Sequence, residues 1–367
     1  MSVYGRYSFI VPDDIKVSKI RLVDRIWYRV LLCAFTLLLS ALAVLYGTGA
    51  IICYGPSPMA RDIFVLSMLN SDYSAFIPYI YLPESKILDI TEANRVFETD
   101  ARVDSAMIKI ARNDAEMSAD AYVFVNEIKE QLFSGAMMVI PNPAWLSFGS
   151  VINQEGKISG GEKLDDMIAR YGGVGGVGLI SDPGDKKNMS APDNDASGVF
   201  IRGGELIYGA RELERSICGF DGKGKFITGK MTAEEALKAG IRDGLDCSNV
   251  LLVNGKASLT SGVPGGLGAR TAIGQKSDGS VLILVTNGLY GWRPWGKGFK
   301  FSECLGAGIQ DVMDIMLEYG AVNAALLGWA APGAMVMNGA RVDKNRALTR
   351  EEIFSVSAII KASIIYE

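Results

Sequence analysis

The sequence predicts an α+β domain with a mixed, largely antiparallel β-sheet and packed helices, preceded by one N-terminal transmembrane helix. Three observations lead to this prediction. An uncharged apolar run lies near the N-terminus, short β-rich runs separated by glycine turns fill the chain from Tyr122 onward, and only three amphipathic helices interrupt those runs. Since hairpin signals outnumber helices, most neighbouring strands should be antiparallel.

The apolar run extends from Val30 to Ala60 without a charged side chain. A helix needs about 20 apolar residues to cross the hydrocarbon core of a bilayer, so the run is long enough. Ahead of it stand six basic and three acidic residues, and this excess predicts a cytoplasmic N-terminus. We therefore expect a single-pass cell-membrane protein with a cytoplasmic tail (1–29), an anchor (30–55) and an extracytoplasmic remainder. The alternative is a cleaved signal peptide, because Ala41-Leu42-Ala43 matches a cleavage site.

Beyond the anchor, we expect a stalk or linker at 56–121 and one folded domain at 122–367. Several pairs in the domain predict hairpins, because asparagine, aspartate and glycine accept the turn conformation; these are Gly203-Gly204, Asn254-Gly255, Asp278-Gly279 and Asn338-Gly339. Helices are expected at Glu162–Tyr171, from Thr232 to near Gly240, and from Ile309 to Gly320. Thr232 and Glu235 form a capping-box pattern, which is typical of a helix start.

Composition excludes several classes of function. The chain has no histidine, which removes any mechanism that needs an imidazole base or ligand. Its formal net charge is −4, so we expect no nucleic-acid partner. Five cysteines without C-x-x-C spacing make a zinc site unexpected, and we predict no metal or cofactor. Cys218, Cys247 and Cys304 either include one disulfide or are buried small hydrophobic residues.

Residues 122–366 carry a series of sequence blocks that resemble the phosphodiester glycosidase domain. These are Gly229–Ala233, Gly240–Asp243, Leu252–Lys256, Ala269–Gln275, Asp278-Gly279 and Asp314–Ala324, which keep their order and approximate spacing. The resemblance implies the fold of that family and a ligand at the cell surface, namely a glycan or sugar-phosphate polymer that contains sugar-1-phosphodiesters. It indicates no particular protein partner.

Two departures from the family pattern bear on catalysis. Where the resemblance implies acidic residues at the ends of two strands, this chain has Asn287 and Gly328. Cleavage of a sugar–phosphate diester needs a proton donor and a base or nucleophile, commonly two carboxylates. We therefore expect weak or lost catalysis, and whether the protein is an enzyme stays open. The alternatives are a hydrolase whose acids come from the Asp182–Asp195 loop, or a structural subunit of a membrane assembly.

The candidate catalytic residues are Arg270, Asn287, Asp182 and Asp193. Arg270 suits a phosphate through its planar fork, or pairs with a nearby carboxylate. Other candidate substrate-binding residues are Thr271, Trp292, Trp295 and Trp329. The tryptophans either stack on sugar rings or plug an emptied pocket.

Overall fold

The computed structural model describes residues 26–69, 75–94, 97–110, 122–151, 161–181, 198–260, 266–288, 306–327, 333–343 and 353–361. The chain divides into two compact units, Met1–Pro56 and Ser57–Glu367. The second unit contains all of the described strands.

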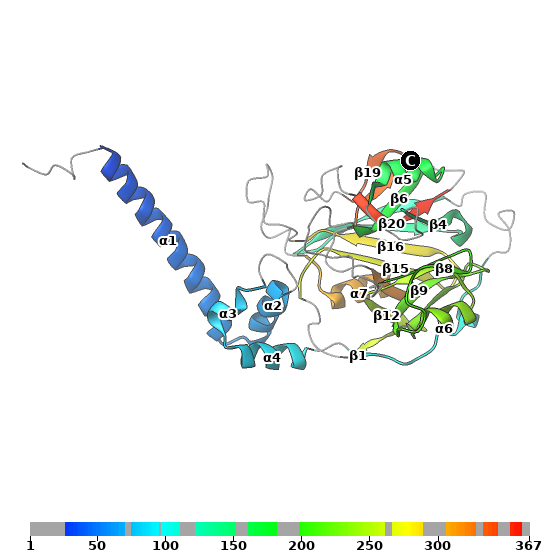
Figure 1. Ribbon diagram of the computed structural model, residues 1–367, viewed down its shortest axis with the longest axis horizontal. Coiled ribbons are helices and arrows are strands. Elements are labelled where there is room, and N and C mark those ends of the chain that lie inside the picture. The colour runs from blue at the N-terminus through cyan, green and yellow to red at the C-terminus, as the bar shows by residue number, and fades with distance from the viewer. Residues whose placement is uncertain are drawn as a thin grey trace, which may run out of the picture. The chain divides into compact units, whose positions relative to one another are not determined.

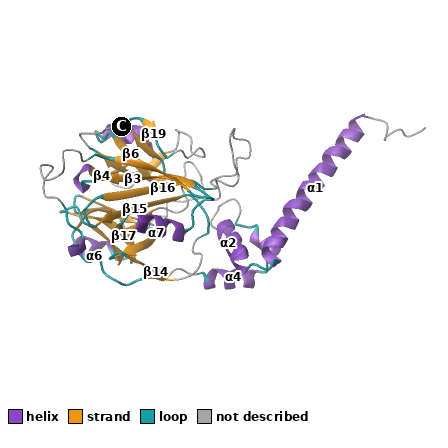
Figure 2. Ribbon diagram, turned by 180° about the vertical axis from the view of Figure 1, so that it is seen from behind, coloured by secondary structure: helices purple, strands orange, loops and turns teal. Residues whose placement is uncertain are grey.

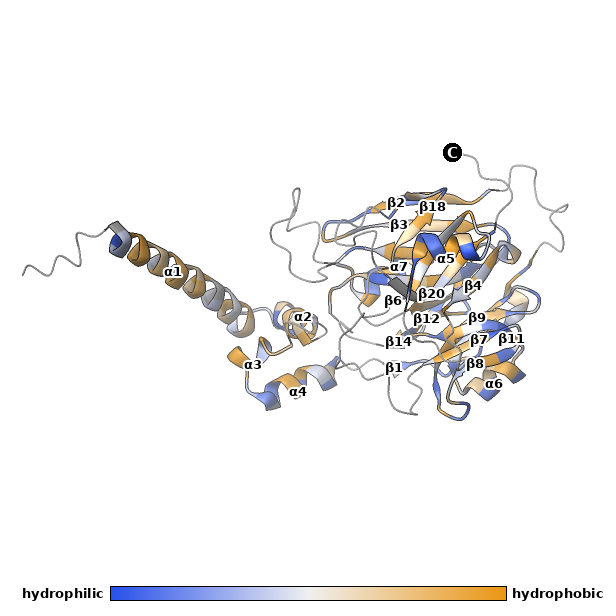
Figure 3. Ribbon diagram, turned by 45° about the horizontal axis from the view of Figure 1, so that its top comes forward, coloured by the Kyte–Doolittle hydropathy of each residue, from blue (hydrophilic) through white to orange (hydrophobic). Residues whose placement is uncertain are grey.

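The first unit is built on one long helix, α1 (Ile26–Tyr54), drawn in blue in Figure 1. Its 29 residues span about 44 Å at 1.5 Å per residue, which exceeds the thickness of the hydrocarbon core. Within the described residues it is the one helix long and apolar enough to cross a membrane, and Figure 3 shows its mostly apolar colouring. A membrane anchor and a signal sequence both fit these properties.

The described residues of the expected stalk, from Ser57 onward, belong to the second unit. This segment contains α2 (Pro58–Leu69), α3 (Pro78–Tyr81), α4 (Glu84–Ala93), β1 (Phe97–Glu98) and the 3-10 turn η1 (Ser105–Met107). β1 pairs with β14 (Leu259–Thr260). Both carboxylate oxygens of Glu98 are used, because Oε1 accepts from the Val250 amide and Oε2 from the Ser216 hydroxyl. Residues 57–110 are therefore tied to the domain that follows them in the chain.

The centre of the domain is a seven-stranded sheet in the order β13-β12-β17-β15-β16-β3-β2. Its strands are β2 (Phe124–Lys129), β3 (Ser134–Ile140), β12 (Asn249–Val253), β13 (Lys256–Ala257), β15 (Arg270–Lys276), β16 (Val281–Thr286) and β17 (Ala321–Leu327). One face packs on α7 (Ile309–Glu318), whose Val312 and Met316 are fully buried. Every residue of β16 is buried, because both faces of the strand are covered.

The opposite face packs on two further sheets (Figures 1 and 2). The six-stranded sheet contains β4 (Leu146–Ser150), β5 (Glu162–Lys163), β6 (Gly175–Ser181), β18 (Met335–Met337), β19 (Ala340–Arg341) and β20 (Ile353–Ile360), and α5 (Leu164–Arg170) packs on it. The five-stranded sheet contains β7 (Val199–Arg202), β8 (Glu205–Gly209), β9 (Arg215–Asp221), β10 (Phe226–Met231) and β11 (Ile241–Asp246), and α6 (Ala233–Lys238) packs on it. The short turn η3 (Pro143–Trp145) joins β3 to β4 and so connects two sheets.

Every described strand pair is antiparallel, which confirms the predicted fold class. Gly203 and Gly204, and likewise Asn254 with Gly255 and Asn338 with Gly339, have positive φ and form the expected hairpin turns. The Asp278-Gly279 hairpin also forms, but only Gly279 has positive φ. The hydrogen bond that closes its turn runs from Lys276 N to Ser280 O. This turn is therefore longer than the two-residue turns of the other hairpins.

The helix predictions hold to within a few residues. Thr232 caps α6: its hydroxyl accepts from Glu235 N, and the Glu235 carboxylate accepts from Thr232 N. Cys218 and Cys247 are buried free thiols, so the disulfide alternative does not hold for this pair. Burial is the main cause that raises the pKa of Cys247 well above its usual value, which keeps the thiol protonated. Cys304 lies outside the described residues.

Candidate functional site

Three neighbouring strands of the central sheet end at one place. Arg270 at the start of β15 lies opposite Thr286 at the end of β16, and Thr271 lies opposite Leu327 at the end of β17. Because β15 is antiparallel to both neighbours, its beginning and their ends share one end of the sheet. We call Arg270, Thr271 and Asn287, which directly follows β16, the strand-end site. Position 328, which follows β17, lies outside the described residues.

Arg270 is held rigidly at this end of the sheet. Its side chain is buried, and its guanidinium donates through Nε to Ala307 O (3.2 Å) and through Nη2 to Gly266 O (2.8 Å). Its backbone N donates to Thr286 Oγ1 at 3.0 Å. Burial lowers the pKa of Arg270 to about 10. The guanidinium therefore stays a cation at neutral pH and brings a fixed positive charge to the strand-end site.

Thr271 faces the other side of the sheet, because successive strand residues alternate between faces. Its Oγ1 accepts from Gly333 N at 3.1 Å, ahead of β18. A Cβ at residue 333 would lie 2.4 Å from that oxygen, so the contact needs glycine. The Thr271 side chain thus fastens the central sheet to the six-stranded sheet. A single ligand cannot contact Arg270 and Thr271 on one face of the sheet.

Asn287 fixes the end of β16 to the beginning of β3. Its Oδ1 accepts from Ser134 N (2.8 Å), its Nδ2 donates to Ser134 Oγ (2.7 Å), and its backbone N donates to Ser134 O (2.8 Å). The side-chain amide therefore binds a neighbouring strand through both of its polar atoms. A side-chain amide neither gains nor loses a proton near pH 7, so Asn287 offers no general acid or base.

The loop that binds Arg270 also contacts α2. Leu267 N donates to Ser67 Oγ at 2.9 Å. Gly266 has a φ of +62°, and a Cβ there would lie 2.5 Å from Ser67 N. Only glycine fits this close approach. The helix that follows the predicted membrane anchor therefore touches the segment whose carbonyl holds the Arg270 guanidinium.

The other predicted site residues cannot be placed. Asp182, Asp193, Trp292, Trp295 and Trp329 lie outside the described residues. Relocated carboxylates and sugar-stacking tryptophans therefore stay predictions. Among the residues that the structure does describe, no group of three or more cysteine, aspartate and glutamate side chains could hold a metal ion.

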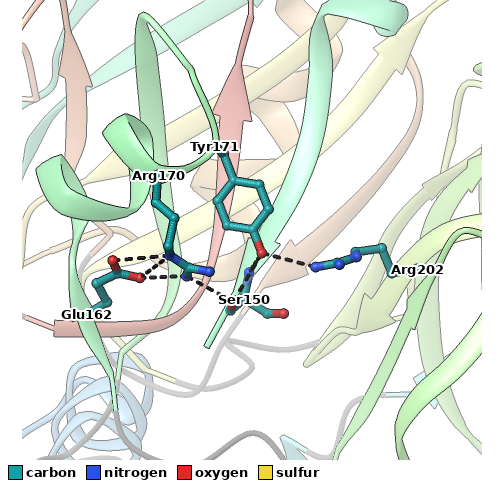
Figure 4. Close-up of polar contacts among 5 residues, drawn as sticks. All are labelled: Ser150, Glu162, Arg170, Tyr171 and Arg202. Atoms are coloured by element: carbon teal, nitrogen blue, oxygen red, sulfur yellow. Dashed lines mark hydrogen bonds and ion pairs between the residues drawn. The ribbon is translucent and has the colours of Figure 1, made fainter. Parts of the chain in front are cut away.

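A polar cluster surrounds Tyr171 and was not predicted from the sequence (Figure 4). Tyr171 Oη accepts from Ser150 N (3.1 Å) and from Arg202 Nη1 (3.0 Å), and it donates to Ser150 O (3.1 Å). The Arg170 guanidinium lies 4.7 Å from the centre of the Tyr171 ring and also binds Glu162. The cluster joins α5, β4 and β7, and its only sequence signal was Tyr171 at the end of a predicted helix.

Electrostatics lower the pKa of the Tyr171 hydroxyl. Burial raises its pKa, but the hydrogen bonds with Ser150 and the charges of Arg202 and Arg170 outweigh burial, so the pKa is lowered overall. Ser150 is the last residue of β4, and Arg202 is the last residue of β7. Within the described residues, the cluster brings two arginines, Arg170 and Arg202, to the ring of Tyr171.

One family model matches the chain. Residues 178–355 match the model described as phosphodiester glycosidase, and this segment includes all three residues of the strand-end site. No curated protein matches the sequence.

Three solved structures resemble the chain in part. The first is the catalytic domain of zebrafish N-acetylglucosamine-1-phosphodiester alpha-N-acetylglucosaminidase, auto-inhibited by its pro-peptide. It has 14% identity and a TM-score of 0.48, over 65% of this chain and 82% of that chain. A hypothetical protein from Synechocystis has 10% identity and a TM-score of 0.39, over 65% of this chain and 61% of that chain. A putative exported protein from Burkholderia pseudomallei K96243 has 11% identity and a TM-score of 0.41, over 63% of this chain and 74% of that chain.

Proposed function

Residues 178–355 belong to the phosphodiester glycosidase family, and on this premise we propose that the protein is a membrane-anchored binder of sugar-1-phosphodiester glycans with weak or lost catalysis. The observation that carries the proposal is Arg270. It is a buried guanidinium, charged at neutral pH and held by two backbone carbonyls where three strands end. A cation held rigidly in partly desolvated surroundings attracts a phosphodiester more strongly than a mobile surface charge does.

The loss of catalysis rests on two positions. The side-chain amide of Asn287 neither donates nor accepts a proton as an acid or base at neutral pH, and both of its polar atoms already bind Ser134. Gly328 has no side chain. A general acid or base contributes about 10² to 10⁴ in rate, so the absence of both carboxylates should remove most of the turnover.

The proposed location follows from α1 and from the charges that precede it. An uncleaved α1 would anchor the protein in the cell membrane, with the basic N-terminal tail in the cytoplasm and the glycosidase-like domain outside. In this proposed topology the strand-end site would lie on the side where surface glycans occur. Protease protection of a C-terminal tag in intact cells tests the topology: digestion supports it, and protection overturns it.

The binding test uses the full chain in detergent micelles and a methyl diester of N-acetylglucosamine 1-phosphate. Binding affinity is measured together with the release of free sugar. We expect binding without release above background. Arg270→Met should weaken binding about tenfold or more, because one charge-assisted contact is worth about 1.5–3 kcal/mol. Arg211→Met, at an exposed arginine between β8 and β9, is the control and should bind normally.

Sugar release also decides between a binder and a hydrolase. Robust turnover that Asp182→Ala or Asp193→Ala abolishes would overturn the binding proposal and support a hydrolase with relocated carboxylates. Unchanged diester binding by Arg270→Met would show that the glycan site does not include Arg270.

A further inference from the structure

A second candidate site lies at the opposite end of β15 from Arg270. A pocket of about 890 Å³ opens there between the β9–β10 hairpin, η3 and residues 108–110. Gln275, near the end of β15, hydrogen bonds to the hairpin that lines this pocket. β15 has seven residues, so the two ends of the strand are about 20 Å apart. The pocket is therefore distinct from the strand-end site.

The basic side chains that line the pocket are Lys109, Lys223, Lys225 and Arg242, and the acidic ones are Asp221 and Asp243. Both carboxylates are already engaged by the protein. Asp221 Oδ1 accepts from Lys223 N and Lys225 N, each at 2.8 Å. Asp243 accepts from Arg242 Nε at 2.7 Å and from Gly203 N at 3.1 Å.

Two of the ammonium groups are available. Lys109 and Lys223 are exposed, and neither Nζ atom has a partner among the residues that the structure describes. Lys225 Nζ, in contrast, donates to Ser105 O. Since four basic and only two acidic side chains line the pocket, its net charge is positive. Its best complement is an anion with about two negative charges.

The pocket wall is not uniformly polar. Pro143, Leu146 and Phe220 contribute to the lining beside the lysines. C–H faces of a sugar ring pack on such apolar groups, while hydroxyl groups need the polar atoms nearby. The volume lies within the range of small-molecule sites, about 300–1,000 Å³.

The hairpin that forms one wall is held in place by Gln275. Its Oε1 accepts from Phe226 N at 2.7 Å, and its Nε2 donates to Gly224 O and Gly279 O, each at 2.9 Å. Gln275 is fully buried, so these bonds form away from water. The wall is thus preformed, which reduces the entropy lost when a ligand binds.

We propose that this pocket binds a saccharide carrying a phosphomonoester, with the phosphate between Lys109 and Lys223. A phosphomonoester carries close to two negative charges at neutral pH, which matches two free ammonium groups, whereas a phosphodiester carries one. The inference does not depend on the proposed function, because it uses none of the residues of the strand-end site.

The test measures how the full chain in detergent binds N-acetylglucosamine 1-phosphate, inorganic phosphate and N-acetylglucosamine, by isothermal titration calorimetry. We expect the sugar phosphate to bind more tightly than either part. Lys109→Gln combined with Lys223→Gln should weaken it about tenfold or more, because two charged contacts are lost. Lys256→Gln, at an exposed lysine on β13, is the matched control.

Gly222→Leu provides a second variant that leaves the lysines unchanged. Gly222 lines the pocket, and a Cβ added there meets no atom within 4 Å. The new side chain should occupy the space of the sugar ring without disturbing the fold, which thermal unfolding checks. We expect it to weaken the sugar phosphate more than inorganic phosphate.

Several outcomes would overturn the inference. They are an absence of measurable binding at millimolar sugar phosphate, an affinity unchanged by both pocket variants, or an equal affinity for inorganic phosphate. Arg270→Met separates the two sites. It should leave the affinity for the monoester unchanged and weaken only the binding of the diester. If Arg270→Met weakens monoester binding and the lysine variants do not, the pocket assignment is refuted and the strand-end site is supported.

Discussion

Asn287 and Ser134 bind each other through three hydrogen bonds, although 153 positions separate them in the chain. Two of these bonds use the side-chain amide as acceptor and donor at once. The residue that stands where the family resemblance implies an acid is therefore a structural link between β16 and β3. This relationship predicts how the site responds to restoring the acid.

Asn287→Asp should fold, because a carboxylate accepts from Ser134 N and from the Ser134 hydroxyl. These two donors should hold the pKa of the introduced carboxyl below its unfolded value of about 3.9. Its stabilising effect is then present above about pH 4 and is lost as the pH falls through the lower, folded-state pKa. Chemical unfolding from pH 2 to 7 measures this.

Asn287→Ala is the comparison, because it leaves Ser134 N without an acceptor. We expect it to lower the free energy of unfolding by about 1–3 kcal/mol across the same pH range. Sugar release should not appear in Asn287→Asp, since Gly328 still provides no second acid. Release well above background would show that one carboxylate suffices.

Gln275→Leu should be strongly destabilising, by about 3 kcal/mol or more, because it leaves Phe226 N and two carbonyl oxygens without their buried partner. Urea unfolding measures the change. Gln310→Leu, on the exposed face of α7, loses only one hydrogen bond to Asp314 and should change stability by less than about 0.5 kcal/mol. Similar effects of both substitutions would contradict the role assigned to Gln275.

Glu98 tests whether the segment before residue 122 belongs to the folded domain. Its carboxylate accepts from Val250 N, from Asn249 Nδ2 and from the Ser216 hydroxyl. Glu98→Ala should lower the free energy of unfolding by about 2 kcal/mol, whereas Glu130→Ala, in an exposed turn, should have little effect. Likewise, removal of residues 1–100 should lower the melting temperature, and removal of 1–56 should not.

Arg270 should make stability depend on pH at the alkaline end. Burial lowers its pKa from the ordinary arginine value to about 10, which corresponds to about 3 kcal/mol of unfavourable free energy for the buried cation at neutral pH. The cost is fully present below pH 10 and is relieved as the pH rises through this folded-state pKa. Relative to Arg270→Met, the wild-type protein should therefore gain stability between pH 9 and 11. A constant difference over this interval would contradict the shift.

Several local features of the fold could be predicted because their causes are local. Thr232 and Glu235 are three residues apart and cap α6 as expected. Asn254-Gly255 adopts positive φ at both positions. At Asp278-Gly279 the pattern predicted the hairpin correctly but not the length of its turn. The hydrogen bond from Lys276 N to Ser280 O closes a longer loop, and the residue pair alone does not determine that length.

The sequence by itself determined the apolar α1, the antiparallel α+β class and several hairpin turns. These follow from hydrophobic periodicity, turn residues and strand order, which act between near neighbours. Only the tertiary structure decided that Asn287 binds Ser134, that Thr271 binds the Gly333 amide, and that basic residues from three segments line one pocket. These contacts join residues far apart in the chain, so they depend on how three sheets pack and register, and no local pattern specifies that packing.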